Sequence, residues 1–268
     1  MSTLKTIIKE HISYKNQIVK LAKADLIKTY RGSALGWFWA IIKPAVTIFV
    51  YWFAFEIGLR TGKNVSSYPF FLWLLAGIVP WFYISDMLTA GTDCIRKNPH
   101  LVTKMKFPVS VIPTFTNISK IMVELILIVL TILIFIGMGY SPTIYIIQLP
   151  IYIIFMFMFF NFWSLFASFI AGMSKDFANL VKSFITAIFW LSGILWNVDT
   201  INISWLKVLL KVNPVTYIST GFRDCFLGQE WFFQRPFELL AFLILMVIML
   251  IAGLWSYKKL YKEIPDVL

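Results

Sequence analysis

Six ionisable side chains interrupt the long apolar stretches of this sequence. They are Lys43, Glu56, Asp86, Lys120, Glu124 and Lys182. A charge at membrane depth is costly unless it faces an aqueous cavity, pairs with a counter-ion or reaches the headgroups from a span end. We expect Lys43 and Glu124, in the inner halves of their stretches, to face a cavity or each other. A proton relay needs several carboxylates at one depth, which only Glu124 and Asp86 supply, so the pattern disfavours a proton-driven pump.

Motifs for nucleotide, metal or acid–base chemistry are missing from the sequence. The stretch GLRTGKN, Gly58 to Asn64, is one residue too short for a phosphate-binding loop, and Asn64 replaces the magnesium-binding hydroxyl. His11 and His100 are far apart, and no His or Cys cluster has the spacing of metal ligands. We therefore expect no catalytic site, metal or cofactor in this chain, and we disfavour a membrane enzyme.

The composition predicts an all-α integral membrane protein. Of the 268 residues, 59% are hydrophobic and only 14% are charged, with a mean hydropathy of +0.79. Without water to satisfy the backbone, helices are the expected way to span lipid. Six apolar runs reach the roughly 20 residues that a membrane span needs. A single transmembrane domain of residues 35–268 should hold spans at about 35–57, 69–92, 108–138, 145–172, 178–197 and 236–257.

The lysines and arginines set the orientation. Most of them fall on the side of both termini, so the positive-inside rule places both termini in the cytoplasm, as an even number of spans requires. We interpret the net charge of +11 as an orientation signal and not as a sign of nucleic-acid binding. Residues 1–19 do not form a signal peptide, because lysines and Glu10 interrupt every apolar run. Cys94 and Cys225 fall on opposite sides and are expected to be free thiols.

Two cytoplasmic segments have the character of short surface helices. Residues 1–34 form an expected interface helix, whose apolar positions over 4–30 recur at helical spacing with lysines mostly opposite. It is either a simple membrane anchor or a surface that also meets a partner. Residues 93–108, after the second span, have room for one short helix that either remains a solvated loop or docks another protein.

The region before the last span, residues 198–235, is too apolar for a free external loop. Helical spacing before and after Asn213-Pro214 predicts two external half-helices. Broken helices at membrane depth must be buried in protein or line an aqueous cavity, so this region either caps the bundle or borders a pathway. The tryptophans near span ends also have two interpretations. Either they form a belt at the headgroups, or some of them line a saccharide path.

The stretches YRGSALGWFWAIIKP, MSKDFANLV, TKMKFPVSVIPT and NPVTYISTGFRD resemble permease subunits of type-2 ABC exporters that move lipid-linked polysaccharides. Within that group the chain is most similar to the teichoic acid translocation permeases of Gram-positive bacteria. The resemblance implies a homodimer in the bacterial plasma membrane, bound to two ABC ATPase subunits that hold ATP and Mg²⁺. It further implies that the substrate is wall teichoic acid linked to undecaprenyl diphosphate, flipped or threaded across the membrane among its lipids.

The resemblance also assigns roles to residues. The substrate entrance would include Lys28, Arg31, Trp37, Trp39 and Lys43. The path would include Tyr51, Trp52, Trp73, Trp81, Trp190 and Trp196. Coupling to the ATPase would involve Arg96, Lys97, Asn98, Leu101 and Lys104. The external gate would include Leu206, Leu210, Asn213, Pro214, Tyr217, Phe222 and Arg223. The rival interpretations are an exporter of capsular or O-antigen polysaccharide and, from another class, an ion-coupled carrier.

Overall fold

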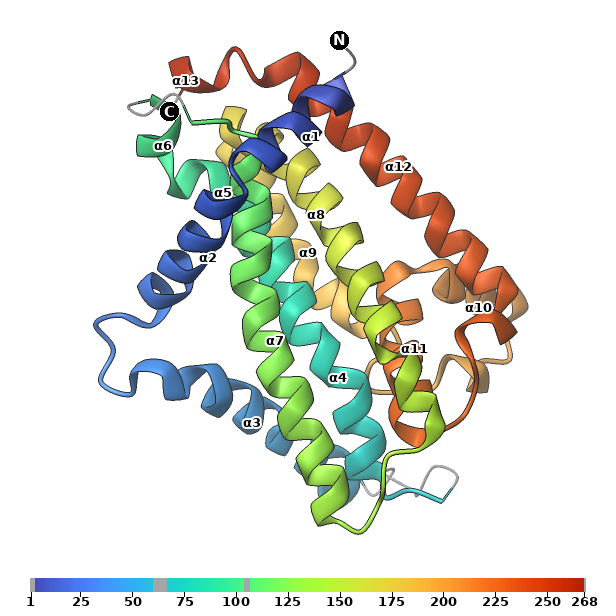
Figure 1. Cartoon of the computed structure of the whole chain (residues 1–268). Coiled ribbons are helices and arrows are strands. Elements are labelled where there is room, and N and C mark those ends of the chain that lie inside the picture. The colour runs from blue at the N-terminus through green and yellow to red at the C-terminus, as the bar shows by residue number, and fades with distance from the viewer. Residues whose placement is uncertain (1–2, 60–66, 104–106, 268) are drawn as a thin grey trace.

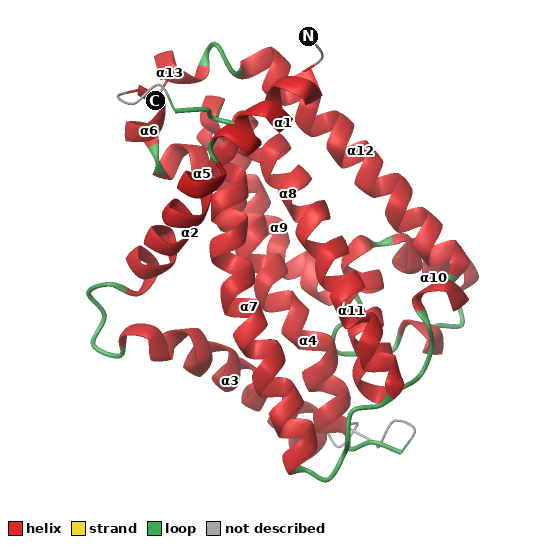
Figure 2. Ribbon diagram, in the orientation of Figure 1, coloured by secondary structure: helices red, strands yellow, loops and turns green. Residues whose placement is uncertain are grey.

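The computed structural model of the chain describes residues 3–59, 67–103 and 107–267 (Figure 1). Every regular element of these residues is a helix, as the composition predicts (Figure 2). The α-helices are α1 (Thr3–Ser13), α2 (Lys15–Tyr30), α3 (Trp39–Trp52), α4 (Phe70–Asp86), α5 (Thr92–Lys97), α6 (Pro99–Thr103), α7 (Val111–Gly137), α8 (Leu149–Met173), α9 (Lys175–Trp190), α10 (Ser204–Val212), α11 (Pro214–Leu227), α12 (Pro236–Leu260) and α13 (Ile264–Val267). Short 3-10 or π-helical segments are η1 (Gly36–Phe38), η2 (Phe53–Gly58), η3 (Met87–Gly91), η4 (Ile144–Gln148), η5 (Val198–Thr200) and η6 (Phe232–Gln234).

Five helical segments of the described residues are long and apolar enough to cross a membrane. They are Gly36–Gly58, Phe70–Lys97, Val111–Gly137, Ile144–Met173 and Pro236–Leu260. These match five of the six expected spans. The second is a continuous rod of α4, η3 and α5, with 78% of its apolar stretch buried, and it lies at the centre of the bundle (Figure 1). In the first and last spans only 11% of that stretch is buried, so most of their surface faces outward.

The fifth expected span, 178–197, differs from the structure. Helix α9 has 16 residues and ends at Trp190, which corresponds to roughly 24 Å of rise against the ~30 Å of a hydrocarbon core. The chain then turns at Gly193, whose φ of +59° is a left-handed conformation that other residues rarely adopt. The apolar run continues through this turn to residue 197, so hydropathy alone joined a helix and a bend into one span.

The two half-helices expected before the last span are present as α10 and α11. The Asn213 side chain accepts a hydrogen bond from the Val215 N–H at 2.9 Å and so caps α11, while Pro214 fits its first turn. Gly228, at a φ of +64°, ends the same helix. Asn213 also donates to the Ser192 hydroxyl at 3.0 Å, which fastens the break between the half-helices to the turn after α9.

The amphipathic segment is two helices, α1 and α2, broken at Tyr14. Its apolar face is partly used inside the chain, because Ile18, Ala22 and Leu26 are buried and α2 packs along α7. Ile12 and Ile27 remain about three-fifths or more exposed. The segment is therefore anchored on protein as well as presenting an apolar surface outward.

Both chain termini lie at the same end of the molecule (Figure 1). A second core, separate from that of the bundle, joins the elements there, and we call it the end cluster. Its buried side chains include Ile7, Ile18, Ile95, Leu101, Val102, Phe169, Tyr257 and Ile264. The Glu10 carboxylate adds polar ties by accepting hydrogen bonds from the Ser110 hydroxyl and, at 3.2 Å, from the Tyr257 hydroxyl.

Candidate functional site

A polar cavity of about 660 Å³ opens between α3, α4 and α7, next to the end of α2. Its lining combines hydroxyl, charged and aromatic side chains. The polar and charged members are Thr29, Tyr30, Ser33, Lys43, Thr47, Ser85, Asp86, Thr89, Lys120 and Glu124, and the aromatic ones include Trp39, Trp81, Phe82 and Tyr83. Such a mixture suits a ligand with both hydrogen-bonding groups and flat apolar faces.

The charges in this cavity come from three helices. Lys120 on α7 pairs with Asp86 of α4 at 3.3 Å. Lys43 on α3 is exposed and forms no ion pair with the described residues. Glu124 is 1% exposed and has no ion pair within the described part of the chain. The expectation that Lys43 and Glu124 face a cavity is met for Lys43, whereas Glu124 contributes to the wall of this cavity with both carboxylate oxygens buried.

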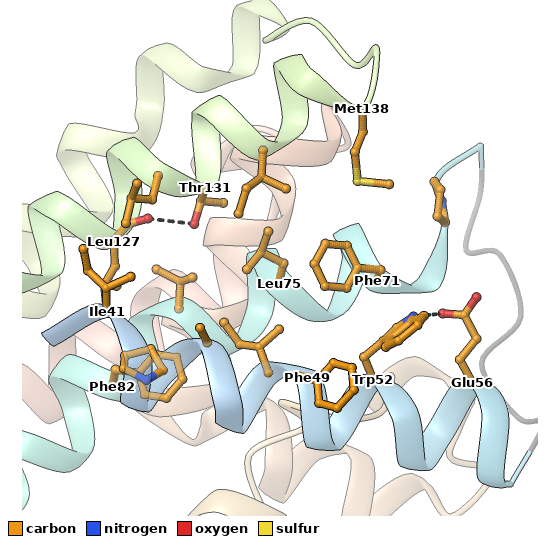
Figure 3. Close-up of a pocket in the computed structure, with 17 residues that line it drawn as sticks. Ile41, Phe49, Trp52, Glu56, Phe71, Leu75, Phe82, Leu127, Thr131 and Met138 are labelled. Atoms are coloured by element: carbon orange, nitrogen blue, oxygen red, sulfur yellow. Dashed lines mark hydrogen bonds between the residues drawn. The ribbon is translucent and has the colours of Figure 1, made fainter. Parts of the chain in front are cut away.

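An apolar groove of about 570 Å³ continues from the polar cavity between the same three helices. The two share Pro44, Phe82 and Leu127 as lining residues. Figure 3 shows Ile41 and Phe49 of α3, Phe71 and Leu75 of α4, and Met138 after α7 pointing into the groove. We call the cavity and the groove together the trough, which is polar at one end and apolar at the other.

The groove is nearly free of polar groups. Thr131 satisfies its hydroxyl on the Leu127 carbonyl at 2.8 Å, and the Trp52 indole donates to the Glu56 carboxylate at the far end (Figure 3). Pro44 lies inside α3, where it removes one helical hydrogen bond at the boundary between the polar and apolar parts. An amphiphile with a polar head and a long hydrocarbon chain fits this division better than a uniformly polar solute does.

The five residues expected at a substrate entrance do not share one surface. Trp39 and Lys43 line the polar end of the trough. The Trp37 ring lies tilted against Tyr30, with 5.7 Å between the ring centroids, and Arg31 is exposed just after α2. Lys28 faces a separate cavity between α2, α5 and α7. Only part of the expected entrance therefore lies at the trough.

Of the six aromatic residues expected along a path, Tyr51, Trp81 and Trp190 lie around the Phe189 ring, and the rings of the other three do not. Trp52 and Trp81 line the trough, one at each end. Trp73 is buried and forms part of the core. The Tyr51 ring lies 5.3 Å from Phe189, whereas the Trp196 indole donates to the Trp190 carbonyl at 3.0 Å in the turn after α9. Within this single chain the six residues form no continuous aromatic strip.

The residues expected to couple to an ATPase lie at the end of the second span. Arg96 donates to the Ala171 carbonyl at 3.1 Å, Asn98 closes α5, and Leu101 of α6 is buried in the end cluster. Lys97 is exposed. Lys104 lies outside the described residues. This segment is thus two short helices, α5 and α6, held on the bundle by packing, and Lys97 is the exposed member of the described four.

One of the expected gate residues, Arg223, has a buried guanidinium. Arg223 of α11 is 5% exposed and donates to the carbonyls of Trp73 at 3.3 Å, Gly193 at 3.0 Å and Ile194. Its Cζ lies 3.6 Å from the centre of the Trp73 ring. A side chain at Gly77 would overlap this guanidinium, so only glycine leaves room for it. Through these contacts Arg223 joins α11 to α4 and to the turn after α9.

The remaining predicted gate residues are split between buried and partly exposed positions. Tyr217, Phe222 and Leu210 are buried, and Leu206 and Pro214 are partly exposed. Ion pairs surround them. Lys211 bridges Asp199 at 2.9 Å and Glu238 at 3.2 Å, and Arg235 contacts Asp224 at 3.1 Å and Glu230 at 3.0 Å.

Two carboxylates of this region have shifted pKa values. Burial raises the pKa of Asp224 to about 7, against the opposing attraction of Arg235. Asp199 behaves differently, because partial burial alone would raise its pKa, but the ammonium of Lys211 lowers it overall. Of these two ion-paired carboxylates, Asp199 therefore has a pKa below its usual value, whereas Asp224 has a pKa of about 7.

Sequence reasoning missed the Lys120–Asp86 pair and the role of Tyr30 in lining the trough. The available signal was the position of both charges within apolar stretches, but the pairing depends on how α4 packs on α7. The described residues hold no group of three or more His, Cys, Asp or Glu side chains placed to bind a metal. Cys94 and Cys225 are both buried free thiols, as expected.

Helices long enough to span a membrane, with an amphipathic trough between them, are typical of a membrane transport subunit. The sequence model of the ABC-2 type transporter family matches residues 16–227. The chain therefore belongs to the ABC-2 type transporter family.

Three relatives align with this chain over nearly its full length. The chain is 24% identical, over 96% of its length and 95% of the relative's, to the "O-antigen export system permease protein RfbA" of Myxococcus xanthus. Two proteins of the same description from Klebsiella pneumoniae are 24% and 25% identical, each over 94% of both chains. The resemblance to type-2 ABC permeases is thus confirmed at the family level, while its teichoic acid part stays a prediction.

Proposed function

We propose that this chain is the membrane subunit of an ATP-driven exporter of a lipid-linked polysaccharide. The observation that carries the proposal is the trough, whose polar end holds Lys43 and the Lys120–Asp86 pair and whose other end is an apolar groove. A polyprenyl diphosphate carrying a glycan has the same division. Its hydrocarbon chain fits the groove, and its anionic head and sugars fit the polar end.

Lys43 is the residue we assign to the head group. It is exposed at the trough and free of any ion pair with the described residues, so its ammonium is available to a phosphate. A charge-assisted hydrogen bond of this kind contributes ~1.5 to 3 kcal/mol when partly desolvated. Aromatic faces such as Trp39 and Trp81 supply weaker and repeatable contacts for sugars, which suits a polymer that must move on.

The energy for export would come from a partner protein that hydrolyses ATP. We propose that the end with both termini, α5 and α6 is cytoplasmic, that two ATPase subunits bind there, and that two copies of this chain form the transport path. The exposed apolar surface of the first span, including Val46, Val50 and Phe53, supports such pairing, because this chain leaves it uncovered. ATP turnover would then drive alternating access or processive export.

For the polymer, the relatives favour the O-antigen class, since all three carry O-antigen export in their names. Wall teichoic acid on undecaprenyl diphosphate is the second candidate, and it rests on the sequence resemblance described above. Both substrates share the lipid diphosphate that the trough would hold, and they differ in the repeat unit beyond it.

The test is to purify the chain with its copurifying ATPase and to measure ATP turnover with and without each lipid-linked glycan. We expect stimulation by one of them, and Lys43→Gln should raise the glycan concentration for half-maximal stimulation about 10-fold. Lys23→Gln, an exposed lysine of α2 that lines none of the cavities described above, is the matched control. A chain that purifies alone and transports under a proton gradient would refute the proposal in favour of an ion-coupled carrier.

A further inference from the structure

A second polar cavity, of about 380 Å³, lies on the other side of Lys120 between α2, α5 and α7. It differs from the trough in its lining. Lys28 and Asp25 come from α2, Lys97 from the last turn of α5, and Thr116 and Lys120 from α7. Figure 1 shows these helices meeting close to the end that holds both termini. We call it the lysine cavity.

Ammonium groups outnumber carboxylates in the lysine cavity. Lys28, Lys97 and Lys120 face a single carboxylate of the lining, that of Asp25. Lys120 is already paired with Asp86, but Lys28 and Lys97 form no ion pair with the described residues. Two ammonium groups from different helices therefore share one space with a single carboxylate, and the net positive charge attracts an anion.

A buried hydroxyl in the same cavity lacks a partner. Thr116 is 4% exposed, and its Oγ1 forms no hydrogen bond with the described residues. The neighbouring groups are committed elsewhere, because the Thr29 hydroxyl donates to the Asp25 carbonyl at 2.9 Å and the Asn98 amide donates to the Cys94 carbonyl at 2.9 Å. An unsatisfied buried hydroxyl is costly, and an oxyanion in the cavity would accept its hydrogen bond.

We propose that the lysine cavity binds a phosphate group, held by Lys28, Lys97 and the Thr116 hydroxyl. Phosphate matches the donors because it offers several strong acceptor oxygens to ammonium groups that arrive from separate directions. A metal cation is disfavoured by the lysines. The phosphate belongs either to an anionic lipid headgroup or to a soluble or lipid-linked diphosphate.

The position of the site gives it a consequence beyond the proposed transport path. A bound phosphate would tie α2 to the end of α5, next to Asn98 and the start of α6. It would thus link the amphipathic helix to the segment proposed to meet the ATPase. The site is separate from the groove that takes the lipid chain, so it would be occupied whether or not that groove is.

The test is a binding measurement on the full chain, with any partner that copurifies, in neutral detergent. One arm titrates pyrophosphate by calorimetry. The other arm counts phosphatidylglycerol against phosphatidylcholine retained by the protein in native mass spectrometry. We expect binding in at least one arm, which also identifies the source of the phosphate, and Lys28→Gln with Lys97→Gln should weaken it about 10-fold.

Two further variants keep the interpretation specific. Thr116→Val preserves shape and should weaken binding by roughly 3-fold or more because it removes one donor. Lys23→Gln removes an exposed lysine of α2 outside the cavity and should leave binding unchanged. Absence of binding in both arms, or an equal loss in Lys23→Gln and the double variant, would overturn the proposal. The measurement needs no transport, so its failure leaves the export function untouched.

Discussion

Replacing Arg223 tests whether the half-helices are fastened to the bundle through one buried guanidinium. In Arg223→Leu the carbonyls of Gly193 and Ile194 lose a donor while they remain buried, and the Trp73 carbonyl, which also belongs to the hydrogen-bond ladder of α4, loses a second one. Each unsatisfied carbonyl costs ~1 to 3 kcal/mol, and the stacking on Trp73 is lost as well. Relief from burying a charge offsets part of this, so we expect a net loss of about 3 to 5 kcal/mol in unfolding free energy.

The assay is a thermal melt in detergent followed by tryptophan fluorescence. The expected loss corresponds to a fall in Tm of roughly 6 to 20 °C for a chain of this size. The Tm of Arg223→Lys should lie between those of Arg223→Leu and the original chain, because one ammonium does not reach both the α4 carbonyl and the turn after α9. Lys207→Leu is the control, since the Lys207 ammonium has only solvent-exposed contacts with Asp199, a 3.5 Å ion pair worth at most ~1 kcal/mol and a 2.8 Å hydrogen bond to the carbonyl. A melt of Arg223→Leu within about 2 °C of the original chain would refute the reasoning.

Two more predictions concern the same region. Gly77→Ala should lower Tm although alanine is the better helix former by ~1 kcal/mol, because its methyl group overlaps the guanidinium; a rise in Tm in the same melt would contradict this. Asp224 has a higher pKa folded, about 7, than its ordinary 3.8, so its contribution to stability falls as pH rises between these values. Asp224→Asn should flatten that dependence, measured as unfolding free energy at about pH 5 and about pH 8, and an unchanged slope would exclude Asp224 as the source.

Most of the helical architecture could be predicted from the sequence, because burial in lipid leaves a strong hydropathy signal. The five long spans, the break at Asn213 and the segment after the second span all follow from local patterns. The bounds of the fifth span differ from the expected ones for a physical reason. Hydropathy does not distinguish an apolar helix from an apolar turn, and the turn at Gly193 is buried by packing with Val198.

The candidate site could be predicted only in part. Lys43 and Glu124 were singled out because charges are rare at membrane depth, and both line the trough. Which aromatic residues share a surface depends on helix rotation and crossing, which sequence spacing does not give. Trp73 illustrates this limit, since its ring lies beneath Arg223, 150 residues further along the chain, and not along a path.

The end cluster has a mechanical consequence. Leu101 of α6 shares one close-packed core with Ile7 of α1, Tyr257 of α12 and Ile264 of α13, and such interiors transmit displacement with little compression. A push on α6 would therefore move both ends of the chain as one body. Spin labels at Lys9 and Lys258 should keep a constant separation during ATP turnover, and a changing separation would show that this end deforms. The end of the molecule that holds both termini would then move as one rigid unit during transport.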